Sequence, residues 1–179
     1  KDNQLYLFGS ISSTPLWNYD INYDIKSIAI SADGEYIAVG SEVSVLLFDK
    51  DSSTPLWTYE VSEDQKSVTT VAISADGEYI VAGSFDDKIY AFDKDSSTPL
   101  WSYTTDGDVY TVSISADGQH IAAGTWSSDD EDNIYFFNLD SSTPVWHTIT
   151  PNNICCIWNI DISADGKYIV AGTYDGSSI

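Results

Sequence analysis

The feature that most constrains the fold is a repeat with a period of about 40 to 48 residues. The tetrapeptide SADG occurs at residues 31–34, 74–77, 115–118 and 163–166. A second marker, STP followed by an apolar residue and Trp, ends at Trp17, Trp57, Trp101 and Trp146. Because both markers recur with one period and in a fixed phase, the chain is expected to be an array of similar structural units.

The clearest copy of the unit, residues 67–103, predicts four short strands, a to d. The runs VTTVAIS, EYIVAGS, KIYAFDK and LWSY are rich in β-branched and aromatic residues. Turn-forming Asp, Gly, Ser and Pro bound each run, which is the pattern of strands joined by tight turns. No apolar period of 3.6 residues supports a helix. Trp57 and Trp101 in strand d, with Phe48 and Phe92 in strand c, recur at one register and are expected to fill the gaps between units.

The succession of strand, DG turn, YIVAGS, acidic turn and IYAFD resembles the blade of WD-repeat proteins. The following DSSTPLW is similar to the tryptophan segment of quinoprotein-type repeats. The Trp-Asp pair of WD repeats is replaced here by Phe48-Asp49 and Phe92-Asp93. The resemblance covers essentially the whole chain and implies an all-β fold, a β-propeller of four-stranded antiparallel blades. It implies little about activity, because propellers host many functions.

We expect one β-propeller domain or propeller segment over residues 1–179, with three complete blades and a fourth split between the termini. The expected boundaries are 1–20 for strands c and d of the split blade, 21–60, 61–104 and 105–150 for the complete blades, and 151–179 for strands a and b of the split blade. The ring could close as four blades in one chain, as eight blades in a homodimer, or within a longer array. Since the sequence contains no methionine, Lys1 is expected not to be a translational start.

The charge balance excludes some partners. The sequence has 28 acidic residues, seven lysines and no arginine, which gives a net charge of −21. Such a surface repels phosphate backbones, so nucleic-acid binding is not expected. No run of 18 apolar residues occurs, and membrane insertion is not expected either. The acidic composition, the abundant Ser and Thr and the lack of Arg and Met favour an extracellular or cell-surface location.

The repeats differ mainly in the b–c and d–a loops, which lie on one face of the predicted disc. Binding residues are often carried by variable loops on a rigid scaffold. Aligning strand a on SADG places four dissimilar residues near the mouth of the central channel: Lys26, Thr69, Tyr110 and Trp158. An exposed Trp and Tyr there would suit contact with a protein or a glycan, although Trp158 could equally pack at a blade edge. Asp161, a lone acid in its column, could also face the channel.

The longest b–c loop is acidic and contains Asp129, Asp130, Glu131 and Asp132. Clustered carboxylates can ligate calcium, which takes six to eight oxygen ligands, and Asp129, Asp130 and Asp132 would be the ligands. The loop lacks EF-hand spacing, so a solvated acidic loop is the favoured interpretation. No cofactor is therefore expected.

Catalytic groups are scarce. His120 and His147 lie outside any motif, and a nucleophile needs a positioned base. The chain resembles quinoprotein dehydrogenases, which carry a disulfide between adjacent cysteines beside the cofactor, and Cys155 and Cys156 would be the matching pair. Those enzymes also use an arginine at the quinone, and this sequence has no arginine. We expect a non-catalytic binding or scaffold module. The alternatives are a structural subunit of an extracellular surface layer or sheath, and the propeller portion of a larger quinoprotein-like enzyme.

Overall fold

The computed structural model describes residues 3–61, 67–127, 133–149 and 157–173. These ranges form five antiparallel sheets, three of four strands and two of two strands. The first four-stranded sheet contains β3 (Ile25–Ile30), β4 (Tyr36–Ser41), β5 (Ser44–Asp49) and β6 (Trp57–Glu60). The second contains β7 (Val68–Ile73), β8 (Tyr79–Ser84), β9 (Lys88–Asp93) and β10 (Trp101–Thr104). The third contains β11 (Asp108–Ile114), β12 (His120–Trp126), β13 (Asn133–Asn138) and β14 (Trp146–Ile149). The two-stranded sheets contain β1 (Gln4–Phe8) with β2 (Pro15–Asp20), and β15 (Ile157–Ile162) with β16 (Ile169–Thr173).

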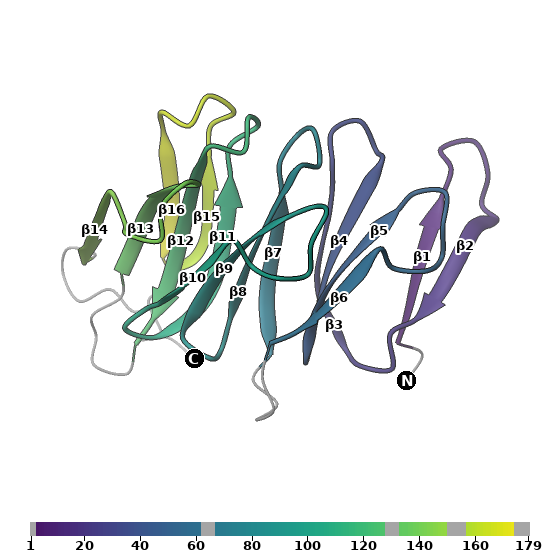
Figure 1. Ribbon diagram of the computed structural model, residues 1–179, viewed down its shortest axis with the longest axis horizontal. Coiled ribbons are helices and arrows are strands. Elements are labelled where there is room, and N and C mark those ends of the chain that lie inside the picture. Colours follow the sequence, from purple (N-terminus) through teal and green to yellow (C-terminus); the bar gives the residue numbers. More distant parts are fainter. Residues whose placement is uncertain (1–2, 62–66, 128–132, 150–156, 174–179) are drawn as a thin grey trace.

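The predicted all-β fold is confirmed, because each four-stranded sheet is one propeller blade whose consecutive strands are hydrogen-bonded neighbours. Figure 1 shows the sheets side by side in an open arc, with the β1–β2 pair at one end and the β15–β16 pair toward the other. These pairs are the two halves of a fourth blade, but they form separate sheets in this chain. Over the described ranges, no helix has the length and apolar character needed to cross a membrane.

The SADG motif forms the turn between the first two strands of each blade. In the first copy, the Ser31 hydroxyl donates to the Asp33 carboxylate at 2.6 Å and accepts the N–H of Tyr36 at 3.0 Å. The same two hydrogen bonds recur in the other three copies. The glycine of the motif has a φ between 69° and 77° in all four copies, a region that residues with a Cβ rarely adopt. These hydrogen bonds and the positive φ of the glycine explain why Ser, Asp and Gly recur in all four copies of the motif.

Aromatic side chains fill the space between consecutive blades. Phe48 and Phe92 are fully buried, and the Trp57 ring lies 5.4 Å from the ring of Phe92 in the next blade. The indole N–H of Trp57 also donates to the Lys94 carbonyl of that blade at 2.7 Å. The same bond joins Trp17 to Lys50 and Trp101 to Leu139, at 2.7 and 2.6 Å. Each tryptophan thus packs its ring into the gap and satisfies its polar N–H there.

A glycine in the second strand of each complete blade allows the next blade to approach closely. A Cβ at Gly83 would lie 2.5 Å from Cγ1 of Val109. The corresponding distances are 2.8 Å from Gly40 to Val68 and 2.3 Å from Gly124 to Ile157. These distances are shorter than van der Waals contact, so a side chain at any of the three positions would push two blades apart.

Candidate functional site

The four residues predicted at the channel mouth share an unusual backbone position. Lys26, Thr69, Tyr110 and Trp158 are each the extra residue of a β-bulge, where the innermost strand of a blade shifts register against the second strand. A bulge re-aims the side chain of its extra residue and interrupts the regular alternation of the strand. The repeat therefore places four side chains of different chemistry at equivalent points around the inner edge of the arc.

These side chains line one cavity of about 520 Å³, together with Ser67 and Phe85. Three of the lining residues are aromatic and form a continuous row. The Phe85 and Tyr110 ring centroids are 5.2 Å apart, and those of Tyr110 and Trp158 are 5.7 Å apart. Trp158 is 62% exposed, so its ring forms an open wall of the cavity rather than part of the core.

Lys26 and Thr69 contribute polar groups to the lining of the cavity. The Lys26 ammonium group forms ion pairs with Glu42 at 3.2 Å and with Asp24 at 3.8 Å. The Thr69 hydroxyl lies within hydrogen-bond distance of two backbone carbonyl oxygens, that of Gly83 in its own blade at 2.9 Å and that of Val109 in the next blade, which holds the side chain between two blades. The cavity thus combines an aromatic wall with one cation that two carboxylates hold in place.

Asp161 does not line this cavity. It lies three residues beyond Trp158 on β15, roughly 10 Å along an extended strand. Its carboxylate accepts hydrogen bonds from the Ser113 hydroxyl at 3.0 Å and from the Ile162 N–H at 2.9 Å. Asp161 thereby links the innermost strands of two neighbouring blades, β11 and β15.

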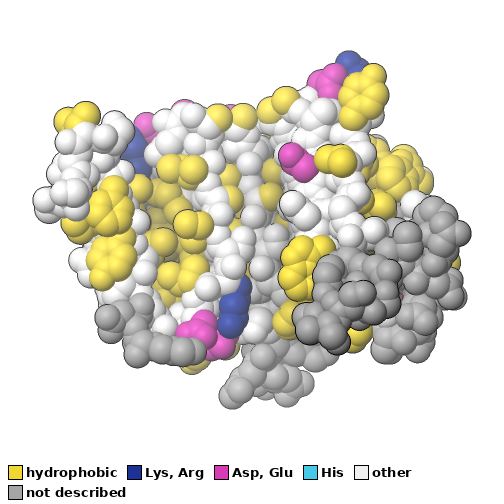
Figure 2. Space-filling view, turned by 180° about the vertical axis from the view of Figure 1, so that it is seen from behind, with side chains coloured by type: hydrophobic (Ala, Val, Ile, Leu, Met, Phe, Trp, Pro, Cys, Tyr) yellow, Lys and Arg dark blue, Asp and Glu magenta, His cyan; other side chains and the backbone are white. Residues whose placement is uncertain are grey.

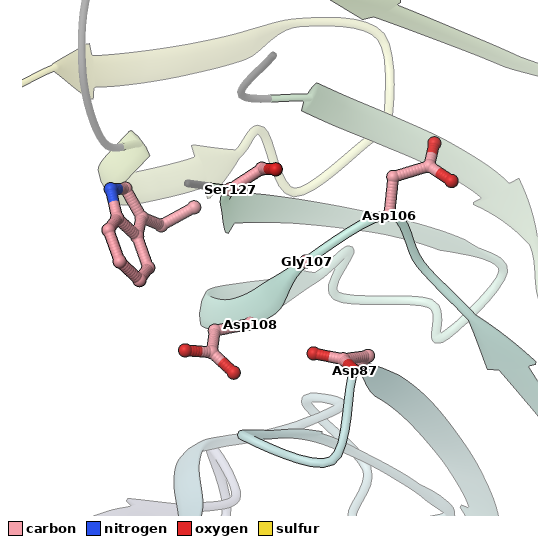
Figure 3. Close-up of a pocket in the computed structure, with 6 residues that line it drawn as sticks. Asp87, Asp106, Gly107, Asp108 and Ser127 are labelled. Carbon is pink, nitrogen blue, oxygen red and sulfur yellow. The ribbon is translucent and has the colours of Figure 1, made fainter. Parts of the chain in front are cut away.

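Three aspartates line a second cavity of about 260 Å³. Its walls include Asp87, Asp106, Asp108 and Trp126. Figure 3 shows the Asp87 and Asp108 carboxylates on one side of it, whereas the Asp106 side chain points away. Asp106 accepts a hydrogen bond from the Tyr135 hydroxyl at 3.1 Å. Burial raises the pKa of Tyr135, so this phenol stays protonated and acts as the donor.

A metal site is not apparent in the parts of the chain that the structure describes, where no three His, Cys, Asp or Glu side chains are arranged to hold an ion. The proposed calcium ligands Asp129, Asp130 and Asp132 lie outside the described residues, as does Glu131. Cys155 and Cys156 also lie outside them. The calcium and disulfide expectations therefore stay predictions.

Sequence reasoning missed Phe85 and the bulges. The column alignment was restricted to the innermost strand, whereas Phe85 follows the second strand. The residue at that point varies between blades as Glu42, Phe85 and Trp126. Glu42 contacts Lys26, and the other two contact Tyr110. Aligning this second column would have found the missing wall. The bulges were missed because the extra residue stands at the same position in all four copies, so that comparing the repeats reveals no insertion.

The sequence matches a known protein family over almost its whole length. Residues 1–174 match the family described as outer membrane protein assembly factor BamB. The chain belongs to this family. It is a family of quinoprotein-type propeller repeats, so that part of the resemblance is confirmed, and the likeness to WD repeats is compatible with it. No curated protein matches the sequence.

The propeller architecture is widespread, since 1493 solved chains resemble this one. One of them belongs to the hydrazine synthase of Kuenenia stuttgartiensis, with a TM-score of 0.79 and 17% sequence identity. The alignment covers 96% of this chain and 49% of that chain, so this chain spans about half the length of the solved one. At such low identity the similarity shows the fold alone, and a fold this common does not by itself indicate a function.

Proposed function

We propose that this propeller segment is a non-catalytic binding module whose aromatic cavity receives a protein or glycan partner. The observation that carries the proposal is the set of four β-bulges, which bring Lys26, Thr69, Tyr110 and Trp158 to one cavity. Equivalent backbone positions with different side chains are what a repeat scaffold offers to a specific partner.

The chemistry of the cavity suits recognition better than bond making. An exposed indole ring offers a flat apolar face to a sugar ring or to an aromatic or aliphatic side chain. The Lys26 ammonium group and its carboxylate partners offer polar contacts beside that face. A nucleophile paired with a positioned base, which catalysis of acyl or glycosyl transfer would need, does not occur among the residues that line the cavity.

The family description supports a binding role and a location outside the cytoplasm. It names an assembly factor rather than an enzyme, and one that acts on outer membrane proteins. The 28 acidic residues give the molecule a strongly negative field, which favours a partner surface of the opposite charge. We therefore favour a protein partner first and a glycan second.

Trp158→Ala tests the proposal directly. We expect this variant to weaken binding of the best ligand by about tenfold or more, because aromatic anchors at the centre of an interface carry much of its energy. The wild-type chain would be screened against a peptide display library and a glycan array, and the affinity of the best hit would be measured by fluorescence titration.

The matched control is Leu16→Ala, since Leu16 is 66% exposed and does not line the cavity. This variant should bind as the wild type does. If Trp158→Ala and Lys26→Ala both retain wild-type affinity for every hit, the cavity is not the binding site and the proposal is wrong.

A structural subunit of a surface layer or sheath is the second candidate. The observation in its favour is the exposure of apolar side chains at both ends of the arc, including Ile28 at 62% and Val170 at 68%. Open-ended polymerisation into filaments or sheets at raised concentration, visible by electron microscopy, would support this candidate over the first.

A further inference from the structure

The turns at one end of the blades form a face whose repeats are nearly identical. In each complete blade, SADG joins the first two strands and DSSTP joins the last two. The SADG turns lie along the upper edge in Figure 1, and Figure 2 shows acidic side chains along the same edge. Because the turns repeat so closely, a position at which one blade differs from the others can be recognised by comparing the three copies.

In the first two complete blades, a lysine before DSSTP links the two turns. The ammonium group of Lys94 lies 3.2 Å from a carboxylate oxygen of Glu78 and 3.2 Å from one of Asp95. The Lys94 side chain is only 19% exposed, so most of its carbon chain is covered while its charged end reaches the two carboxylates. The first complete blade repeats this arrangement, at 3.0 and 2.8 Å, with Lys50, Glu35 and Asp51.

The third complete blade keeps this backbone but changes the side chains. Leu139 takes the place of the lysine and Gln119 that of the glutamate, whereas Asp140 is retained. The Leu139 N–H still donates to the Gln119 carbonyl oxygen at 2.9 Å, the same distance as in the corresponding bond of the second blade. In the part of the chain that the structure describes, the lysine that pairs with the aspartate in the other two blades therefore has no equivalent beside Asp140.

A cavity of about 410 Å³ lies at this point, between the second and third complete blades. Its apolar and aromatic wall is formed by Tyr79, Leu100, Trp101 and Leu139. Leu100 is 50% exposed, so its apolar surface is open to a ligand. The Trp101 ring is fixed by its indole N–H, which donates to the Leu139 carbonyl oxygen at 2.6 Å. The apolar wall is thus already in place before any ligand binds.

The other residues that line the cavity are acidic or neutral polar. Asp93 comes from the second complete blade, whereas Gln119 and Asp140 come from the third. One oxygen of Asp93 accepts the N–H of Asp95 at 2.8 Å, which orients this carboxylate. The lining has two carboxylates and no cation, and the whole chain has a net charge of −21. The cavity therefore favours a positively charged group.

We propose that this cavity binds an arginine side chain of a protein partner. The partner's side chain supplies the cation that Lys50 and Lys94 supply in the other two blades. Its carbon chain lies against Leu100 and Trp101, and its guanidinium group bonds carboxylates of both blades. Arginine fits better than lysine because the planar guanidinium group has five N–H donors, which can reach two separate carboxylates, and can stack on an aromatic ring.

This site is separate from the aromatic cavity that Tyr110 and Trp158 line. The two cavities share no lining residue. Tyr110 and Trp158 lie near the beginning of the innermost strands, whereas the present cavity adjoins the turns that follow those strands. The inference therefore does not depend on the proposed function, and failure of either one leaves the other standing.

Two double variants test the proposal without altering the net charge. The filled variant, Leu139→Lys with Gln119→Glu, gives the third blade the lysine and glutamate of the other two, so that the chain's own cation pairs with Asp140. The opened variant, Lys94→Leu with Glu78→Gln, does the reverse and creates an equivalent site at the preceding junction. Each variant adds or removes one lysine and one glutamate, so the net charge stays at −21. The general attraction of cations to the acidic surface is therefore unchanged.

The probe is N-acetyl-argininamide, and the NMR signal of the Trp101 indole N–H reports its binding to the wild-type chain. We expect a saturable change with a dissociation constant of about 1 mM or weaker, the range for a single side chain. N-acetylcitrullinamide, which has nearly the same shape but no charge, should bind at least about tenfold more weakly. The filled variant should bind argininamide at least about tenfold more weakly than the wild type does. In the opened variant the Trp57 indole signal should respond as well, whereas it should not respond in the wild type.

Equal affinity of the filled variant and the wild type would overturn the proposal, and so would equal affinity of the charged and the uncharged compound. Displacement of argininamide by an equal concentration of calcium chloride would identify a metal site instead and would also overturn it. If circular dichroism shows that the filled variant does not fold, the opened variant decides. A Trp57 signal that responds to argininamide supports the proposal, and one that does not respond contradicts it.

Discussion

The aspartates of the SADG turns show how one residue can fix local structure. The Ser163 hydroxyl and then the side chain and backbone N–H of Lys167 lower the pKa of Asp165 to about 2. The pKa values of Asp33 and Asp117 are also lowered, first by the hydroxyls of Ser31 and Ser115. All of these carboxylates are exposed, so each contributes little stability. Their role is to hold the turn that sets strand register.

Ser163→Ala should raise the pKa of Asp165 toward its ordinary range, because its largest stabilising hydrogen bond is lost. A depressed carboxyl pKa adds stability above the unfolded value of about 3.9, and this stability is lost as the pH falls toward 2. The thermal midpoint of the variant should therefore fall less between pH 5 and pH 2 than that of the wild type. Carboxyl-carbon NMR measures the pKa, and Ser96→Ala, which removes a hydroxyl that bonds no carboxylate, is the control. An unchanged Asp165 pKa in Ser163→Ala would contradict this assignment.

Among the elements, the second strand of each blade controls how closely the blades pack. Its glycine leaves room for the first residue of the next blade's inner strand, and the bulge beside that residue turns the following side chain toward the channel. Close packing and the candidate cavity therefore have a common origin. A blade that moved away from its neighbour would also shift the aromatic row formed by Phe85, Tyr110 and Trp158.

Gly83→Ala should destabilise the chain by about 1–3 kcal/mol, because the new methyl group would overpack the interface with Val109. Gly9→Ala is the matched control, since a Cβ there meets only Leu16, at 3.9 Å, and should change stability by less than about 0.5 kcal/mol. Urea denaturation followed by tryptophan fluorescence measures both. Equal stability of the two variants would show that the second-strand glycines are not required for blade packing.

The sequence predicted the elements well because turn chemistry and aromatic register repeat with one period. SADG located four turns, and Trp57 with Phe92 located an interface between blades. Aligning the repeats on SADG also placed the four channel-mouth residues at one equivalent position. It did not reveal that they sit on bulges, because a single extra residue does not alter composition or turn signals. It did not indicate that Asp87 and Asp108 share a cavity, because that depends on how two different loops meet.

At the scale of the whole molecule, the arc is a set of equivalent interfaces between consecutive blades. The core is distributed between blades rather than gathered at one centre. Such repeat architectures add nearest-neighbour interfaces until a cap or a closed ring removes the last exposed one.

The affinity of Trp158→Ala for the best ligand of the wild-type chain tests the proposed binding role most directly. We expect this affinity to be weaker than that of the wild type by about tenfold or more, because the exposed indole ring forms one wall of the cavity. Equal affinity of the two proteins would contradict the account.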